Sequence, residues 1–113
     1  MKIKKFNIYS ADLNPRFGSE SGKIRPVVVI QTNLLNDIHP STIICPVTSN
    51  TVENVILLRV RLNEEINNMK MESDILIDQI RSIDNRRFKK WIGELSHRQR
   101  KKLLENLGLL ILE

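Results

Sequence analysis

Arg25-Pro26-Val27-Val28-Val29-Ile30-Gln31 is the stretch that decides the fold, because its continuous β-branched run is typical of a strand buried on both faces. Proline has no backbone donor, so we expect Pro26 to begin this strand and not to lie inside it. The proline also pushes Arg25 into an extended conformation. The sequence thus fixes one arginine at the point where a polar loop becomes a core strand.

Three segments further along the chain also have the composition of strands. They run over Thr42–Thr48, Val55–Leu62 and Ser73–Ile80. Pro46 lies within the first of them and indicates an edge or a bulge there. Before the deciding stretch, an apolar run from Ile8 to Leu13 breaks at Asn14-Pro15, which is a turn signal.

Helix signals appear only in the last third of the chain. Asp84 is placed to cap a short turn, and Ser96 with Gln99 has the pattern of a capping box. Gly108 suits the end of the helix that follows, and Leu109–Leu112 is then either a short strand or the end of a buried helix. Several short strands with one late helix predict a small, partly open, mainly β barrel with helices at its margin.

Length and composition narrow the class of protein. The chain has 113 residues, of which 41% are hydrophobic, and this fits one domain over residues 1–113 with its own core. No apolar run approaches the roughly 20 residues of a membrane span, and the basic start lacks the apolar segment of a signal peptide. We therefore expect a cytoplasmic protein that does not contact a membrane.

The residues that usually bind metals are sparse. Cys45 is the single cysteine, which excludes an internal disulfide and any zinc site built from several cysteines. It lies in an apolar strand, where a free cysteine behaves as a small hydrophobe. His39 and His97 are far apart and show no ligand spacing. We expect neither a metal nor a cofactor.

The positive charge is concentrated in one part of the chain. The net charge is +5, yet the basic segment, Arg86–Lys102, holds eight basic residues and one acidic residue, a local charge of +7. Such a segment indicates a polyanion or an acidic protein as a partner, or else a solvated helix face. Aromatic residues make up only 4% of the chain, which argues against a row of base-stacking platforms.

The loop before the deciding strand holds the side chains best suited to chemistry. Gly18–Pro26 contains Glu20, Lys23 and Arg25, and a second polar cluster, Thr48-Ser49-Asn50, follows another strand. Arginine presents a planar fork that matches phosphate oxygens, and a hydroxyl beside it could help to hold a phosphodiester. RNA cleavage without a metal needs little more, because the substrate's 2′-hydroxyl is the nucleophile. The alternative is an ordinary hairpin loop with an arginine at its foot.

Four blocks of sequence, in the same order, resemble the MazF/PemK-type toxins of toxin–antitoxin pairs. The blocks are Tyr9-x-Ala11-Asp12-Leu13-Asn14-Pro15, Gly18-Ser19-Glu20-x-Gly22-x-x-Arg25-Pro26-Val27-Val28-Val29-Ile30-Gln31, Pro46-Val47-Thr48-Ser49, and Ser73–Asp84. The resemblance implies a small SH3-like antiparallel β-barrel of the CcdB/MazF type with a C-terminal helix. It also implies a ribosome-independent endoribonuclease that cleaves single-stranded mRNA without a metal, leaving a 2′,3′-cyclic phosphate and a 5′-hydroxyl.

The resemblance also assigns roles to particular residues. Arg25 and Thr48 take the catalytic positions, and Glu20 takes that of a contributing carboxylate. Phe17, Ser19, Gln79 and Arg81 stand where family members contact RNA. We add Lys23, a cation where the family has a small or neutral residue, and Ser49, the hydroxyl beside Thr48. The partners implied are single-stranded RNA, a second copy of the chain in a homodimer whose RNA groove spans both subunits, and an antitoxin with an acidic, partly disordered tail.

Two departures and two alternatives accompany this resemblance. Lys5-Phe6-Asn7 stands where the family commonly has Arg-Gly-Asp, and the connection that begins at Thr48 is short, so the cleaved sequence is open. One alternative is a non-catalytic relative of the same fold, such as a gyrase-poison toxin. The other is a module that binds RNA or protein without turnover. Arg25 and Thr48 discriminate, since a purely protein-binding toxin needs neither at a groove.

Overall fold

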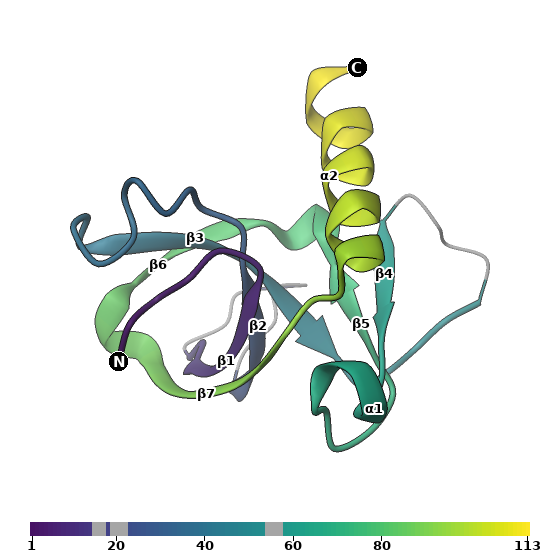
Figure 1. The fold of residues 1–113 in the computed structure, drawn as a ribbon, viewed down its shortest axis with the longest axis horizontal. Coiled ribbons are helices and arrows are strands. Elements are labelled where there is room, and N and C mark those ends of the chain that lie inside the picture. Colours follow the sequence, from purple (N-terminus) through teal and green to yellow (C-terminus); the bar gives the residue numbers. More distant parts are fainter. Residues whose placement is uncertain (15–17, 19–22, 54–57) are drawn as a thin grey trace.

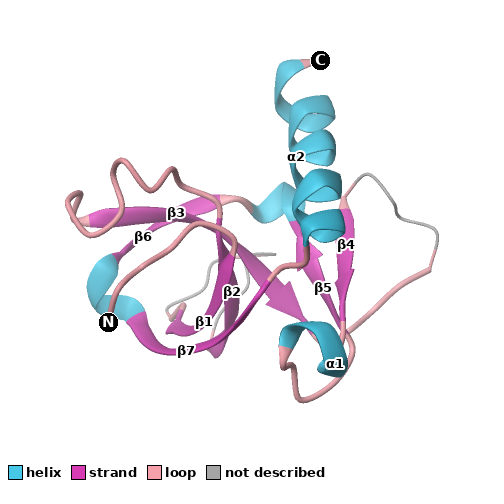
Figure 2. Ribbon diagram, in the orientation of Figure 1, coloured by secondary structure: helices cyan, strands magenta, loops and turns pink. Residues whose placement is uncertain are grey.

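The computed structural model describes residues 1–14, 18, 23–53 and 58–113, and these form a curled antiparallel sheet with a C-terminal helix (Figure 1). The strands are β1 (Asn7–Asp12), β2 (Ile24–Val29), β3 (Ser41–Thr48), β4 (Arg59–Leu62), β5 (Ser73–Leu76), β6 (Arg81–Asp84) and β7 (Phe88–Glu94). The helices are α1 (Glu64–Asn67) and α2 (His97–Leu112), with short 3₁₀ turns η1 (Ile77–Gln79) and η2 (Asn85–Arg87). The predicted mainly β fold with a C-terminal helix is confirmed (Figure 2).

The sheet runs in the order β4-β5-β3-β2-β1-β7, and β3 changes partner along its length. Its first half, Ser41–Ile44, pairs with β6, while Val47 and Thr48 pair with β5. Between these two partners the strand has a gap on one side. This exchange lets the sheet turn away from β6 and curl towards β4, as Figure 1 shows.

The two prolines that lie within strands, Pro26 and Pro46, are tolerated for the same geometric reason. The Ile30 amide donates to the Ile43 carbonyl (3.1 Å), and alternation along the ladder then directs the nitrogen of Pro46 away from β2, into the gap between β6 and β5. β3 is therefore unpaired on one side at Pro46, which agrees with the edge expected there. Pro26 was expected to begin its strand, which is wrong: β2 starts at Ile24, and at Pro26 the strand pairs with β1 only. A missing donor costs little on an unpaired side.

The deciding strand is buried on both faces, as predicted. Val28 belongs to one apolar cluster, with Ile8, Cys45 and Val47. Val27 and Val29 belong to the other, which lies on the opposite face of the sheet. β2 thus connects two cores, and Arg25 is carried at its start.

Other elements differ from the expectations. The strand expected over Ser73–Ile80 ends at Leu76, where η1 intervenes before β6. Of the strand expected over Val55–Leu62, Arg59–Leu62 forms β4, while residues 55–57 lie outside the described residues. β7 was not predicted, because its sequence is rich in exposed lysine and shows no clean alternation.

The C-terminal helix begins where the sequence predicts it and ends later. Ser96 accepts a hydrogen bond from the Gln99 amide (3.2 Å), and the Gln99 side chain accepts one from the Ser96 amide (2.9 Å), which completes the capping box. The helix then continues through Gly108 to Leu112, so the apolar tail is helical. Asp84 caps η2 as expected.

Candidate active site

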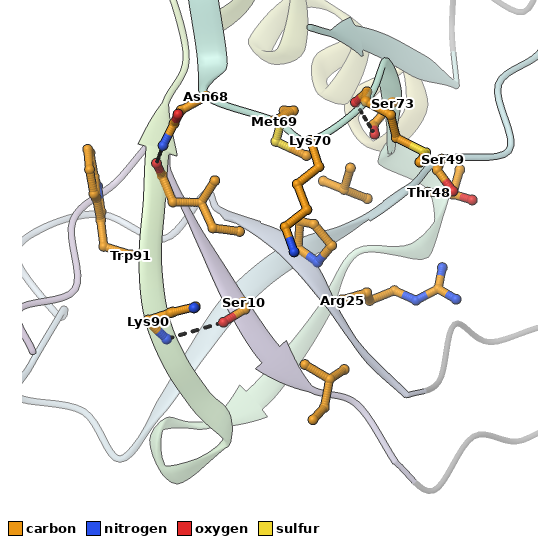
Figure 3. Close-up of a pocket in the computed structure, with 15 residues that line it drawn as sticks. Ser10, Arg25, Thr48, Ser49, Asn68, Met69, Lys70, Ser73, Lys90 and Trp91 are labelled. Atoms are coloured by element: carbon orange, nitrogen blue, oxygen red, sulfur yellow. Dashed lines mark hydrogen bonds between the residues drawn. The ribbon is translucent and has the colours of Figure 1, made fainter. Parts of the chain in front are cut away.

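A hollow of about 650 Å³ lies on the side of the sheet where β2 and β3 diverge. One wall consists of Arg25 and Pro26 on β2 with Val47, Thr48 and Ser49 at the end of β3. The other wall is the turn over residues 68–71 together with residues 90–92 of β7 (Figure 3). Strand ends that are far apart in the sequence thus meet around one space.

Arg25 stands on β2 opposite Ala11 of β1, before the pairing between β2 and β3 starts at Val27. The residue is half-buried, and its guanidinium extends from β2 towards the edge at which Thr48 and Ser49 lie (Figure 3). The backbone of Arg25 is paired on one side and its side chain lies at the rim. A rigid strand therefore presents the guanidinium to the hollow. An arginine placed in this way can bind an anionic group in the hollow.

Thr48 is the last residue of β3, and its hydroxyl oxygen accepts a hydrogen bond from the Asn50 amide (3.1 Å). Because this bond occupies only a lone pair, the hydroxyl proton is left to be donated elsewhere. Ser49 is exposed beside it. Two hydroxyls therefore stand at the rim near Arg25.

The chain after Thr48 is held by a buried carboxylate. Asp74, which is 1% exposed, makes ion pairs with Arg61 (2.5 Å) and Arg59 (3.3 Å) and accepts from the Val52 amide (3.3 Å). The same two arginines donate to backbone carbonyls of the connection: Arg61 to Val52 (3.0 Å) and Arg59 to Asn50 (2.9 Å). This network fixes the segment that carries the hydroxyls.

The second wall is held in place by three asparagines and a glycine. Asn63 caps α1 by accepting from the Ile66 amide (2.8 Å), and buried Asn67 donates to the Glu94 carbonyl (2.9 Å). Asn68 adopts a left-handed conformation (φ 61°) and donates to the Ile92 carbonyl (2.7 Å). At Gly93 the backbone of Asn67 comes so close that a Cβ would not fit. The turn that follows α1 is therefore fixed against β7.

The charge of the hollow is wholly positive among the described residues. Arg25, Lys70 and Lys90 line it, and no lining residue there is an aspartate or a glutamate. Figure 3 shows Lys70 directed from its turn into the space over β2. Cations without a balancing carboxylate favour an anionic ligand.

Comparison with known proteins identifies the family. The family model of PemK-like, MazF-like toxins of type II toxin–antitoxin systems matches residues 4–111. The chain belongs to this toxin family. It is similar to endoribonuclease EndoA of Bacillus subtilis, with 34% identity over 109 residues that cover 96% of this chain and 94% of that protein.

Solved structures of MazF-like toxins share the fold. MazF of Deinococcus radiodurans superimposes with a TM-score of 0.85 at 23% identity, covering 100% of this chain and 99% of that one. A MazE–MazF complex from the same organism gives 0.77 at 19% identity, covering 98% and 96%. An endoribonuclease in complex with its cognate antitoxin, from a mycobacterial species, gives 0.72 at 15% identity, covering 93% and 90%.

The structure of this MazF-like toxin brings some of the expected site residues together and separates others. Arg25, Thr48 and Ser49 line the same hollow. Lys23 is exposed just before β2, with a left-handed backbone (φ 64°), and is not a lining residue. Three further expected residues, Phe17, Ser19 and Glu20, lie outside the described residues.

Gln79 and Arg81 lie on another part of the sheet. Gln79 ends η1, and Arg81 begins β6, where it pairs with Ile44 of β3. Neither lines the hollow. Among the described residues, the buried Nη1 atom of Arg81 has no hydrogen-bond partner, and such a donor is costly to leave unsatisfied.

Sequence reasoning missed two lysines of the toxin's hollow, Lys70 and Lys90. Lys90 belongs to the basic segment, and β7 carries it to the wall of the hollow. Lys70 stands between two methionines in no recognisable motif. No local signal in the sequence would have found it.

The residues that could bind a metal are not grouped. Among the described residues, no cluster of three or more histidine, cysteine, aspartate or glutamate side chains could hold a metal ion. Burial raises the pKa of the Cys45 thiol to about 12, with the nearby Asp78 adding to the effect, so this thiol stays protonated at neutral pH. No helix in the described part of the chain is both long and apolar enough to span a membrane.

Proposed function

We propose that this endoribonuclease cleaves single-stranded mRNA in the cytoplasm by using the substrate's own 2′-hydroxyl as the nucleophile. The 2′ oxygen forms a bond to the adjacent phosphorus and the bond from phosphorus to the 5′ oxygen breaks. The products are a 2′,3′-cyclic phosphate and a 5′-hydroxyl. The observation that carries the proposal is that Arg25 and Thr48 line one hollow whose described walls hold cations and no carboxylate.

Each of these two residues has a role that its placement supports. The Arg25 guanidinium offers fixed N–H donors to the oxygens of the phosphorane, where negative charge accumulates in the transition state. The Thr48 hydroxyl donates a hydrogen bond to the same phosphate. Its oxygen already accepts from the Asn50 amide, so the O–H is the part of the group that remains for the substrate. A donor set of guanidinium and hydroxyl suits phosphate and not a divalent cation, which prefers carboxylate oxygens.

Two proton transfers complete the reaction. A base must take the proton from the 2′-hydroxyl, and an acid must supply one to the departing 5′ oxygen. We assign the base to Glu20, on the grounds of the family resemblance. On the same grounds we assign the acid to Arg25: its guanidinium stabilises the charge, gives a proton to the 5′ oxygen, and regains through solvent the proton that Glu20 took up.

The test is cleavage of a long, mixed-sequence, single-stranded transcript. We expect Arg25→Ala to lower kcat by at least about 100-fold, as loss of one preorganised donor does elsewhere, while the fold is retained. Arg98→Ala, on the exposed face of α2, is the matched control and should cleave normally. Products should carry cyclic phosphate ends, and activity should persist in excess chelator. Full cleavage by Arg25→Ala, or binding without any product, would overturn the proposal.

RNA contacts extend beyond the reacting phosphate. We place Ser49 at the hollow and Lys23 at its approach, and on the grounds of the family resemblance we assign RNA contacts to Phe17 and Ser19. Arg81, half-buried where β6 begins, is assigned an RNA contact on the same grounds. Gln79 is two residues away, at the end of η1.

The partners follow from charge and from one apolar surface. We propose an antitoxin with an acidic tail, since the hollow and the basic segment both favour a negatively charged chain. We also propose a homodimer, since Leu109–Leu112 at the projecting end of α2 are between 43% and 82% exposed. Sedimentation across a range of protein concentrations tests the dimer, and a mass of one chain throughout would exclude it.

A further inference from the structure

Two lysines of the hollow have no task in the proposed mechanism. Lys70 and Lys90 come from different elements, the turn after α1 and strand β7, yet both line the same space as Arg25. Figure 3 shows Lys90 on the side of the hollow away from the rim where Arg25 and Thr48 lie, and Lys70 between Lys90 and that rim. The two lysines therefore extend the positive surface along the hollow and do not concentrate the charge at one point.

Lys90 is positioned by the pairing between β7 and β1. It stands opposite Ser10, and its amide donates to the Ser10 hydroxyl (3.3 Å). Its neighbour Lys89 is also exposed on the same strand but does not line the hollow. The sheet thus presents one of two adjacent lysines to this space.

Lys70 is positioned by a turn that cannot easily move. Asn68 before it has a left-handed backbone and is tied to the Ile92 carbonyl (2.7 Å). The preceding residue, Asn67, is wholly buried and packs its backbone against Gly93. The base of the Lys70 side chain is therefore fixed over the hollow, and only the flexible stem remains to be ordered on binding.

Neither ammonium group is neutralised within the described residues. Every ion pair there is made by an arginine, and the walls of the hollow contribute no carboxylate. Two unpaired ammonium groups at a concave surface attract phosphate as point charges, without the planar, bidentate geometry of a guanidinium. An RNA strand that places one phosphate at Arg25 must continue along the hollow or leave it, and the lysines lie along the hollow.

We propose that Lys70 and Lys90 form a second phosphate subsite, which binds a backbone phosphate of the RNA next to the one that is cleaved. The inference rests on the proposed function of Arg25 and Thr48, because it takes their end of the hollow as the reacting centre. The subsite contributes to affinity and to the direction in which the strand lies, and it leaves the chemical step unchanged. Phosphate contacts of this kind position a strand without reading its sequence.

The experiment separates binding from chemistry. The cleavage site is first mapped on a transcript, and an RNA oligonucleotide containing that site is made uncleavable by a single 2′-deoxy substitution. Binding is then measured by fluorescence anisotropy at several salt concentrations for Lys70→Gln, Lys90→Gln and the double variant. Lys89→Gln is the matched control, since it removes the same charge from an adjacent position outside the hollow.

We expect each of the two variants to weaken binding by about three- to fivefold, the upper part of the range for exposed ion pairs. The slope of log affinity against log salt should fall by about 0.7 per lysine removed, the value for one contact to a single strand. In cleavage assays KM should rise by a similar factor, with kcat within about twofold of the parent. Thermal unfolding should be unchanged, since both side chains are exposed.

Two results would overturn the subsite. One is an equal loss of affinity in Lys89→Gln, which would mean general attraction by the surface. The other is unchanged RNA binding together with weaker binding of an acidic antitoxin peptide, which would assign the lysines to a protein partner. Arg25→Ala is read separately: if it cleaves normally, the catalytic assignment fails, while the lysine variants are still judged on the uncleavable RNA.

Discussion

Thr48 lies directly opposite Asp74 in the register between β3 and β5, so the proposed catalytic hydroxyl shares a strand pair with a carboxylate that is 1% exposed. The carboxylate contacts both Arg59 and Arg61, and each of these also donates to a backbone carbonyl in the connection that follows Thr48. A buried charge cluster therefore fixes the rim of the site from behind. Through this connection the cluster holds the hydroxyl in position, and it does not itself contact the substrate.

Asp74→Asn is expected to lower the free energy of unfolding by about 2–3 kcal/mol. Removing one partner of a fully buried pair costs about 3–5 kcal/mol, and the loss here is smaller because Arg59 and Arg61 keep some contact with water, with side chains 23% and 36% exposed. Urea unfolding followed by circular dichroism measures the change. Activity should fall as well, because the segment after Thr48 loses its anchor.

The control for Asp74 is Asp84→Asn. Asp84 also pairs with an arginine, Arg86, but that arginine is 91% exposed. Exposed pairs contribute little to stability. If the two variants were equally stable, the buried cluster would not be the feature that holds the rim.

Gly93→Ala and Gly108→Ala are expected to change stability in opposite directions. A Cβ at Gly93 would collide with the backbone of Asn67, which has no flexible end to give way. Overpacking of this kind costs about 1–3 kcal/mol. At Gly108, within α2, a Cβ would meet nothing within 4 Å, and alanine in a helix is favoured over glycine by about 0.5–1 kcal/mol.

Urea unfolding of the two glycine variants checks this pair, and a second measurement tests the link to function. Because Gly93 lies under the turn that carries Lys70, Gly93→Ala should also weaken RNA binding. Gly108→Ala should bind RNA as the parent does. Equal and small effects at both positions would show that the turn is not held by the close approach at Gly93.

Cys45 is expected to resist alkylation in the folded protein. Burial raises the pKa of its thiol from 9.0 to about 12, so the thiolate is almost absent at neutral pH. A raised folded pKa stabilises the fold fully below about pH 9, and this contribution is lost as the pH rises towards 12, since the unfolded thiol ionises first. Iodoacetamide at pH 8 should label the protein only in urea, and activity should survive the reagent. Rapid labelling of the native protein would contradict the burial of this sulfur.

Much of the fold could be predicted because its signals are local. The β-branched run of β2 and the pairing of Ser96 with Gln99 each report on a few neighbouring residues, and both predictions are confirmed. β7 was missed because its exposed lysines hide the alternation of a half-buried strand. Pro26 was misplaced because the cost of a missing donor depends on which partner strand is present, and that is a property of the sheet.

The residues of the site also divide into those with a local signal in the sequence and those without one. Arg25 and Thr48 stand in motifs at strand ends, so the sequence could name them. Lys70 and Lys90 reach the hollow only through the packing of the turn after α1 on β7, a contact between residues far apart in the chain. Charge counted along the sequence does not show which lysine of the basic segment a strand presents to which face.

Thr48→Val tests whether the hydroxyl takes part in the chemical step. Valine keeps the shape and the β propensity of threonine but removes both the acceptor for the Asn50 amide and the donor towards the phosphate. We expect kcat to fall by about 100-fold, in the range for one lost transition-state donor, with KM changed by less than about threefold. Thr48→Ser keeps the hydroxyl and should retain most of the rate. Thr51→Val, in the same connection but outside the lining of the hollow, is the matched control and should cleave normally. A loss in Thr48→Ser as large as in Thr48→Val would mean that the methyl group, through its packing, matters more than the proton.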